Sequence, residues 1–153
     1  MAPLRVEIEQ GGRDMIAADP LAPGSLYTAS VDDQGKVGLY RLEVGCSPGT
    51  GKLKIAGGVE GVMKESLQRA FAYLQSQKVK MGIGQPFATT DFHVEAIDLL
   101  SNHVPCEAGV ALVVAIYSAI KRQSVLAGLV ILGDLSIQGN LKAVRTLAEP
   151  LQV

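Results

Sequence analysis

The chain has 153 residues, of which 48% are hydrophobic and 19% charged, with a formal net charge of −1. This length suits one domain with a substantial core, and the apolar composition suits strands covered by helices. No run of about 18 uninterrupted apolar residues occurs, which argues against a membrane span. The start, "MAPLRVEIEQGGRD", lacks the apolar stretch of a signal peptide. The near-neutral charge gives no footprint of a nucleic-acid-binding domain, and the two cysteines do not suggest a disulfide framework, so a cytoplasmic location is expected.

The first part of the chain is typical of strands joined by tight turns. A short strand is expected over residues 4–9 ("LRVEIE"). The segments "SLYTASV" (25–31) and "VGLYRLEV" (37–44) are rich in β-branched and aromatic residues and flank "DDQGK", which predicts a hairpin. A second turn is expected in "GCSPGTG" (45–51), followed by a short strand in "KLKIAG" (52–57).

Two helices are expected in the middle of the chain. The first begins at Val59, because its apolar residues recur with helical spacing on one face: Val59, Val62, Met63, Leu67, Ala70, Phe71 and Leu74. A loop at 81–86 and a strand "FHVEAI" (92–97) follow. The second helix is expected over about 105–121, and its apolar residues on every side predict that it is buried all round.

The sequence of the last third of the chain predicts a buried strand, "GLVILGDL" (128–135), and a turn into a short strand, "SIQGNL" (136–141). "AVRTLAEPL" (143–151) is expected to begin a helix. This order of strands and helices predicts an α+β fold with one mixed sheet and packed helices.

The segment "GCSPGTGK" (45–52) invites comparison with a phosphate-binding loop. Such a loop requires a glycine where Cys46 stands and a hydroxyl residue where Leu53 stands. A glycine- and proline-rich turn between strands is therefore the better interpretation.

Cysteine and histidine side chains provide the candidates for a metal or thiol site: Cys46, Cys106, His93 and His103. No pair has the short spacing of a typical zinc site, and a turn histidine with a small buried thiol is the simpler interpretation. A nucleophile at Cys106 with His103 or His93 as its base stays open, because a helix N-terminus lowers the pKa of a thiol.

Glu107 is expected in the first turn of the second helix. A carboxylate in the first turn of a helix interacts favourably with the helix dipole, by about 0.3–1 kcal/mol, and Pro105 is a common helix-start residue. A role as general acid or base would need a partner that the sequence does not identify.

Four segments together resemble the Lon protease proteolytic domain. The segment 49–75 resembles the family's G-K-G-K-L-x-x-T-G-x-L-G-x-V-M-K-E-S, and its "GVMKES" (61–66) is a specific match to the end of that pattern. "DFHVEA" (91–96), "EAGVAL" (107–112) and "LGDLSIQGNL" (132–141) resemble D-x-H-V-H-V, S-A-G-I-A-M and T-G-E-I-T-L-R-G-x-V, and they align without a gap. The resemblance implies the Lon proteolytic-domain fold, which is ribosomal protein S5 domain 2-like, over residues 24–153 after an N-terminal extension of 1–23.

The family uses a Ser-Lys dyad, in which a lysine takes the proton of the attacking serine. In this register the serine position holds Glu107 and the lysine position holds Pro150. The residues that would support the dyad also differ, at the positions of Leu132 (threonine in the family), Val104 (an acid) and the His-x-His pair, here His93 and Glu95. The resemblance therefore implies a domain without an intact catalytic residue.

Residues 22–44 and 131–152 are most similar to the Lon-like proteins of BREX phage-defence systems. This resemblance implies an assembly module of an AAA+ ATPase that forms a hexameric ring, with no membrane partner. No cofactor is expected in this domain: an attached ATPase domain would bind ATP and Mg²⁺, and other domains could bind DNA. The chain is expected to be incomplete at the C-terminal end of the domain. The alternative is an active ATP-dependent Lon-family serine endopeptidase with a displaced dyad.

Overall fold

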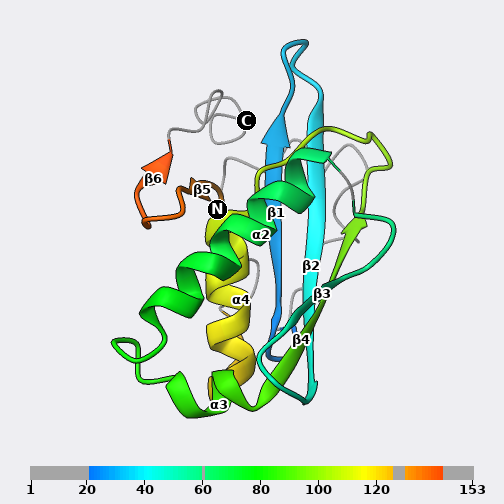
Figure 1. Ribbon diagram of the computed structural model, residues 1–153. Helices are drawn as coiled ribbons and strands as arrows, with labels where there is room; N and C mark the ends of the chain where they lie inside the picture. The colour runs from blue at the N-terminus through cyan, green and yellow to red at the C-terminus, as the bar shows by residue number, and fades with distance from the viewer. Residues whose placement is uncertain (1–20, 60, 126–129, 143–153) are drawn as a thin grey trace.

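The computed structural model describes residues 21–59, 61–125 and 130–142. Its main sheet has the strand order β1-β2-β4-β3, formed by β1 (Ser25–Val31), β2 (Val37–Pro48), β4 (Thr90–Asp98) and β3 (Leu53–Ile55) (Figure 1). β1, β2 and β4 are antiparallel to their neighbours and β3 is parallel to β4, so the sheet is mixed, as expected. The expectation of a single sheet is wrong, because β5 (Asp134–Leu135) and β6 (Leu141–Lys142) form a second sheet of two strands.

The β1–β2 hairpin is confirmed. The Asp32 carboxylate accepts the backbone N–H groups of Gln34 and Lys36 at 2.9 and 2.8 Å, which closes the turn. The turn predicted to begin at residue 45 starts later, because β2 continues to Pro48 and pairs with β4 along that length. Pro48 ends the strand, where the absence of a backbone N–H is tolerated.

Three helices are described: α2 (Gly61–Gln77), the short α3 (Gly84–Ala88) and α4 (Gly109–Lys121). α2 buries the expected apolar face with one exception, since Val62 is 41% exposed. α3 lies partly within the predicted loop 81–86, where burial of Phe87 favours a helical turn. Ile83, just before α3, is also fully buried.

α4 begins later than predicted. The segment 103–108 alternates exposed and buried residues, as an extended chain does, and places Val104, Cys106 and Ala108 inside. The helix can begin only after this segment. Burial of α4 on all sides is also wrong, because Tyr117 is 39% exposed and only one face of the helix is fully buried.

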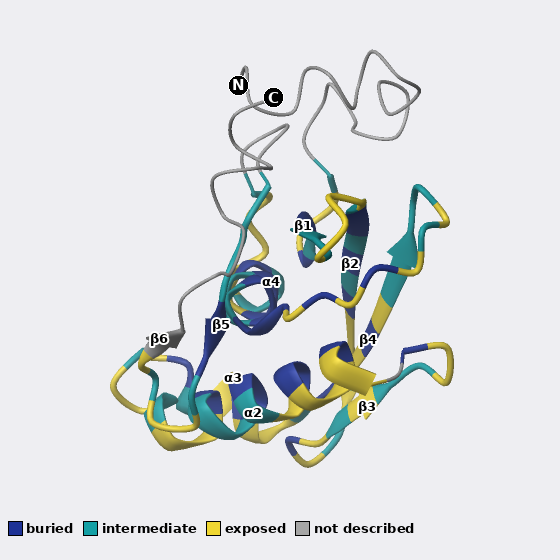
Figure 2. Ribbon diagram, turned by 90° about the horizontal axis from the view of Figure 1, so that it is seen from above, coloured by how far each residue is buried: buried dark blue, intermediate teal, exposed yellow. Residues whose placement is uncertain are grey.

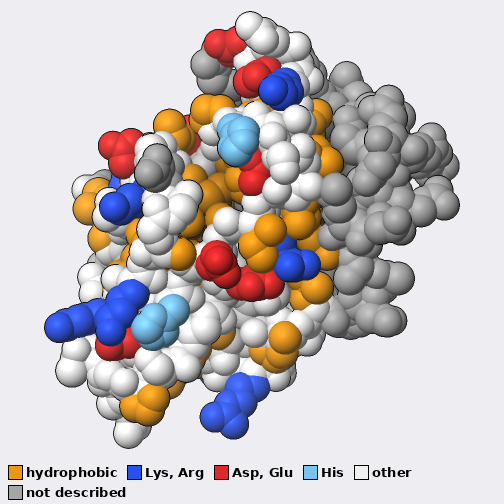
Figure 3. Space-filling view, turned by 90° about the vertical axis from the view of Figure 1, so that its right-hand side faces the viewer, with side chains coloured by type: hydrophobic (Ala, Val, Ile, Leu, Met, Phe, Trp, Pro, Cys, Tyr) orange, Lys and Arg blue, Asp and Glu red, His pale blue; other side chains and the backbone are white. Residues whose placement is uncertain are grey.

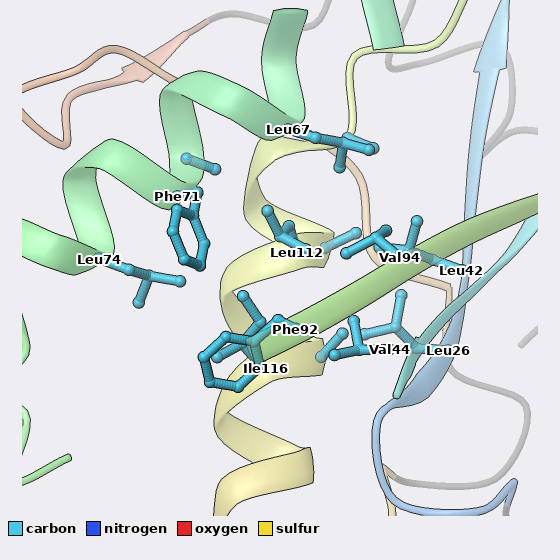
Figure 4. Packing of buried hydrophobic residues seen from close by; sticks show 14 of the residues in the cluster. Leu26, Leu42, Val44, Leu67, Phe71, Leu74, Phe92, Val94, Leu112 and Ile116 are labelled. Atoms are coloured by element: carbon cyan, nitrogen blue, oxygen red, sulfur yellow. The ribbon is translucent and has the colours of Figure 1, made fainter. Parts of the chain in front are cut away.

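The two long helices cover one face of the main sheet. Figure 2 shows α4 between the sheet, α2 and β5. The core between the layers is closed by side chains of α2, α4 and the strands, among them Leu67, Phe71, Leu112, Ile116, Leu42 and Phe92 (Figure 4). Full burial of such side chains contributes about 1.5–3 kcal/mol each, so this cluster is the main source of stability.

A smaller apolar cluster lies on the opposite face of β1, centred on Tyr27, Ala29 and Leu39. Val130 and Leu132 pack against it, and the Ile131 N–H donates to the Tyr27 carbonyl at 2.9 Å. The buried strand predicted over 128–135 is therefore divided, with an isolated bridge at Val130 and β5 after Gly133. A φ of 120° at Gly133 redirects the chain between them.

Two predicted elements, the strand at 4–9 and the helix beginning in 143–151, lie outside the described residues. The short strand expected after "SIQGN" is confirmed as β6. Within the described ranges, each helix is too short or too polar to cross a bilayer.

Candidate functional site

Side chains of β1 and β2 fix the backbone of the turn that precedes Glu107. The Tyr40 hydroxyl donates to the Val104 carbonyl at 2.5 Å, and the Ser30 hydroxyl donates to the Pro105 carbonyl at 2.7 Å. Both bonds join residues more than 60 positions apart in sequence, at separations of 64 and 75. The turn is thus held rigidly against the sheet.

The start of α4 is held from the other side. The Ala108 N–H donates to the hydroxyl of Ser66 on α2 at 2.9 Å, and the Val110 N–H donates to the Gly133 carbonyl at 3.3 Å. These contacts satisfy donors that a helix N-terminus leaves free. The close approach explains Gly109, where a Cβ would overlap the carboxylate of Asp134.

Glu107 belongs to a three-residue ion cluster with Arg69 of α2 and Asp134 of β5. Arg69 Nη2 donates to Asp134 Oδ2 at 2.6 Å and to Glu107 Oε2 at 3.3 Å. The Asp134 side chain is only 3% exposed, whereas that of Glu107 is 48% exposed. Burial raises the pKa of Asp134, but hydrogen bonds from Glu107 and Arg69 outweigh it and hold that pKa below its usual range.

The cluster corrects the interpretation of Glu107 as a first-turn helix residue. α4 begins at Gly109 and has no acidic residue in its first turn, so Glu107 precedes the helix. Its partner Arg69 was missed, because Arg69 is not among the apolar residues that predicted this helix and 38 residues separate the two. No local signal in the sequence links them.

The positions that the family resemblance assigns to the dyad's surroundings are occupied by packed apolar groups. Val104 is 2% exposed and faces inward. Leu132 packs into the smaller cluster with Tyr27, on the far side of the sheet from α4. Pro150, at the lysine position, lies outside the described residues. The loss of the dyad stays a prediction from the resemblance.

His93 and Glu95 lie on the outer face of the sheet, because they alternate with the inward-facing Phe92 and Val94. His93 Nε2 is 2.9 Å from the hydroxyl oxygen of Ser47. Figure 3 shows acidic, basic and histidine side chains close together on this side of the molecule. The structure therefore separates both residues from Glu107, which lies on the helical side.

Cys106 does not have the properties of a nucleophile. It is 1% exposed, its Sγ lies 3.9 Å from Thr28 Oγ1, and burial raises its pKa to about 11. The His103 side chain is 88% exposed and pairs with Asp98 at 3.7 Å. The hypothesis of a thiol with a lowered pKa is thus wrong. In the described ranges, no three His, Cys, Asp or Glu residues gather as metal ligands would.

The backbone of the glycine-rich turn after β2 binds the carboxylate of Asp91, a residue of the protein itself. Asp91 Oδ1 accepts the backbone N–H groups of Thr50 and Lys52 at 2.9 and 3.0 Å. These hydrogen bonds, Lys52 first and then Thr50, lower the pKa of Asp91. A Cβ at Gly49 would overlap this carboxylate. These residues form a structural turn and not a phosphate-binding loop.

A cleft of about 580 Å³ lies beside the turn. Its walls include Val59, Met63 and Pro105, with Asp98 and His103 among its polar groups. Glu107 does not line it. The cleft and the expected nucleophile position are therefore neighbours and do not form one site.

Comparisons with known proteins match this architecture. Residues 28–151 match the Lon protease (S16) C-terminal proteolytic domain. The Lon-like protease BrxL of Escherichia coli O9:H4 (strain HS) is 27% identical over 146 residues, which are 95% of this chain and 21% of that protein. The Lon-like protease BrxL of Bacillus cereus (strain H3081.97) is 30% identical, with 95% and 22% covered. The Lon protease of Buchnera aphidicola subsp. Schizaphis graminum (strain Sg) is 32% identical over 114 residues, with 74% and 15% covered.

The chain thus spans about a fifth of the length of the two BrxL relatives, at 21% and 22%. The match covers both the hairpin and the α4 segment that carry the resemblance. The expectation of a Lon-type domain similar to the Lon-like proteins is confirmed: the chain belongs to the Lon protease C-terminal proteolytic domain family.

Proposed function

We propose that this domain has lost the peptidase chemistry of its family and acts as an assembly module of an AAA+ ATPase. The observation that carries the proposal is the ion cluster of Glu107, Arg69 and Asp134 at the expected nucleophile position. A carboxyl group there replaces the serine hydroxyl that the family uses as its nucleophile. In its ionised form it would also repel the oxyanion that forms when a peptide carbonyl is attacked.

The two carboxylates of the cluster could in principle serve as an acid–base pair. Such a pair needs one carboxyl that stays protonated near neutral pH. Arg69 lies within 2.6 Å of Asp134 and favours its ionised form. Glu107 does not line the neighbouring cleft, where a substrate would lie, so an acid–base mechanism has less support than a structural role for the cluster.

The assembly role rests on the family and on the relatives. Two of the most similar curated proteins are named Lon-like protease BrxL and are several times longer than this chain. We propose a place in BREX phage defence, with a hexameric ring in the cytoplasm. In this proposal an attached ATPase domain binds ATP and Mg²⁺, and other domains contact DNA.

A second candidate, an active serine peptidase with a displaced dyad, has one observation in its favour. The Ser47 hydroxyl lies 2.9 Å from His93 Nε2, a distance suited to a nucleophile and its base. The pair lies exposed on the outer face of the sheet. Digestion of casein, lost in Ser47→Ala, would identify this pair as the dyad.

Two measurements test the proposal. Casein incubated with the chain joined to its ATPase and ATP is expected to stay intact, and digestion would contradict the loss of chemistry. Light scattering of the same protein at several concentrations is expected to give a ring mass. A strict monomer at all concentrations would remove the assembly role.

A further inference from the structure

Among the described strands, β3 is at the edge of the main sheet and lies beside a groove. Within the described residues β3 pairs only with β4, through bonds such as Phe92 N–H to the Lys52 carbonyl and Ala56 N–H to the Val94 carbonyl. In a parallel ladder alternate residues turn their backbone groups to the same neighbour. The N–H and C=O groups of Leu53 and Ile55 therefore point outward, toward the open edge.

The groove next to this edge lies between β3 and α2 and has a volume of about 580 Å³. Its floor contains Leu53, Ile55 and the buried ring of Phe71. Its rim carries the exposed side chains of Lys52 and Lys64, and no acidic residue lines it.

We propose that the groove binds an acidic, extended peptide segment of a partner protein, which adds a strand to β3. Backbone bonds to Leu53 and Ile55 would supply affinity, as in other cases of strand addition. Alternate side chains would enter the groove, where the apolar floor takes small aliphatic groups and Lys52 and Lys64 pair with carboxylates. Strand addition uses both the free edge and the groove, whereas a nucleic acid would use only the lysines. The inference does not depend on the loss of the dyad.

Lysines on an edge strand can also prevent pairing between sheets. Two features favour a binding surface here. Lys64 comes from α2 and not from the strand, and it lines the same groove as Lys52 and the apolar Leu53 and Ile55. Lys54, the charged residue of the strand itself, points to the outer face and is paired with Asp91 at 3.6 Å.

Fluorescence polarisation with a labelled decapeptide of alternating valine and glutamate tests the proposal. The 153-residue chain is expected to bind it with a Kd below about 1 mM. The Lys52→Glu/Lys64→Glu variant is expected to weaken binding about tenfold or more. The matched control Lys36→Glu/Lys80→Glu makes the same change of charge at exposed sites outside the groove, and is expected to leave binding within about twofold.

A peptide with the same sequence and N-methylated backbone amides separates strand addition from simple charge attraction. It is expected to bind about tenfold more weakly or not at all. Three results with the peptides would overturn the proposal: no binding of the unmodified peptide, equal losses in the two lysine variants, or equal binding of the N-methylated peptide. Preferential binding of a single-stranded oligonucleotide at these lysines would overturn it in favour of a nucleic-acid surface.

Discussion

Two turns of this domain resemble functional turns in sequence: one a phosphate-binding loop, the other a nucleophile turn. In each of them a carboxylate of the protein itself occupies the expected site. In the glycine-rich turn after β2, Asp91 accepts two backbone N–H groups. In the turn before α4, Glu107 and the buried Asp134 share the guanidinium of Arg69. The first carboxylate is held by the backbone and the second pair by one side chain.

This difference predicts which substitutions remove the stabilising contacts of each turn. Backbone donors at Thr50 and Lys52 remain whatever side chains those positions carry, so only Asp91 itself can be removed. The cluster at Glu107 depends on Arg69, because its guanidinium pairs with both carboxylates. One substitution therefore removes the guanidinium from both carboxylates, one of them buried.

The largest effect is expected for Arg69→Met. Removing one partner of a buried ion pair leaves Asp134 charged in a nearly dry site, which should cost about 3 kcal/mol of unfolding free energy. Urea unfolding with an unchanged m-value measures it. The matched control is Arg41→Met, whose partner Glu43 is 39% exposed, with an expected cost below about 1 kcal/mol. Equal costs in the two variants would show that the cluster is not a special feature.

The reactivities of the two cysteines compare the two turns directly, because Cys46 lies near the first turn and Cys106 in the second. Cys46 is exposed, although partial burial raises its pKa, whereas full burial raises the pKa of Cys106 to about 11. At pH 8 its thiolate fraction falls roughly a hundredfold below that of an ordinary thiol. Iodoacetamide should therefore modify Cys46 much faster in the folded protein, as peptide mass spectrometry would show. Faster modification of Cys106 would revive the thiol nucleophile.

Asp91→Asn tests the turn that the backbone holds. Since the folded pKa of Asp91 is lowered, its charge stabilises the protein above the unfolded pKa of about 3.9, and this contribution is lost as pH falls through the folded value. The variant should be less stable than the wild type at pH 7. The difference should shrink below about pH 4, in unfolding curves recorded across the range. A difference that grows at low pH would mean that the carboxylate is not held as described.

The smallest effect is expected for Glu107→Ser. Its side chain is 48% exposed, and Arg69 keeps its bond to Asp134, so the loss should be about 1 kcal/mol or less. The substitution restores a hydroxyl but no base. Urea unfolding and casein digestion together measure the outcome, and a loss well above this value would place Glu107 among the main supports of the fold.

Sequence patterns predicted most of the fold and less of the site. The hairpin, β4 and the buried face of α2 follow from local periodicity, and the resemblance identified the segment around Glu107. Local patterns could not reveal that Arg69 turns inward, since its partners lie 38 and 65 residues away. They also placed the start of α4 too early, because the extended segment before it is stabilised by bonds from Tyr40 and Ser30, in distant strands.

The central claim is that the expected nucleophile position holds an ion cluster and no nucleophile. The most direct test is labelling of the wild-type chain and of Glu107→Ser with a fluorophosphonate probe, followed by mass spectrometry of the labelled peptides. The account predicts no specifically labelled serine in either protein. Specific labelling of any serine in the wild type, or of the new serine in the variant, would contradict it.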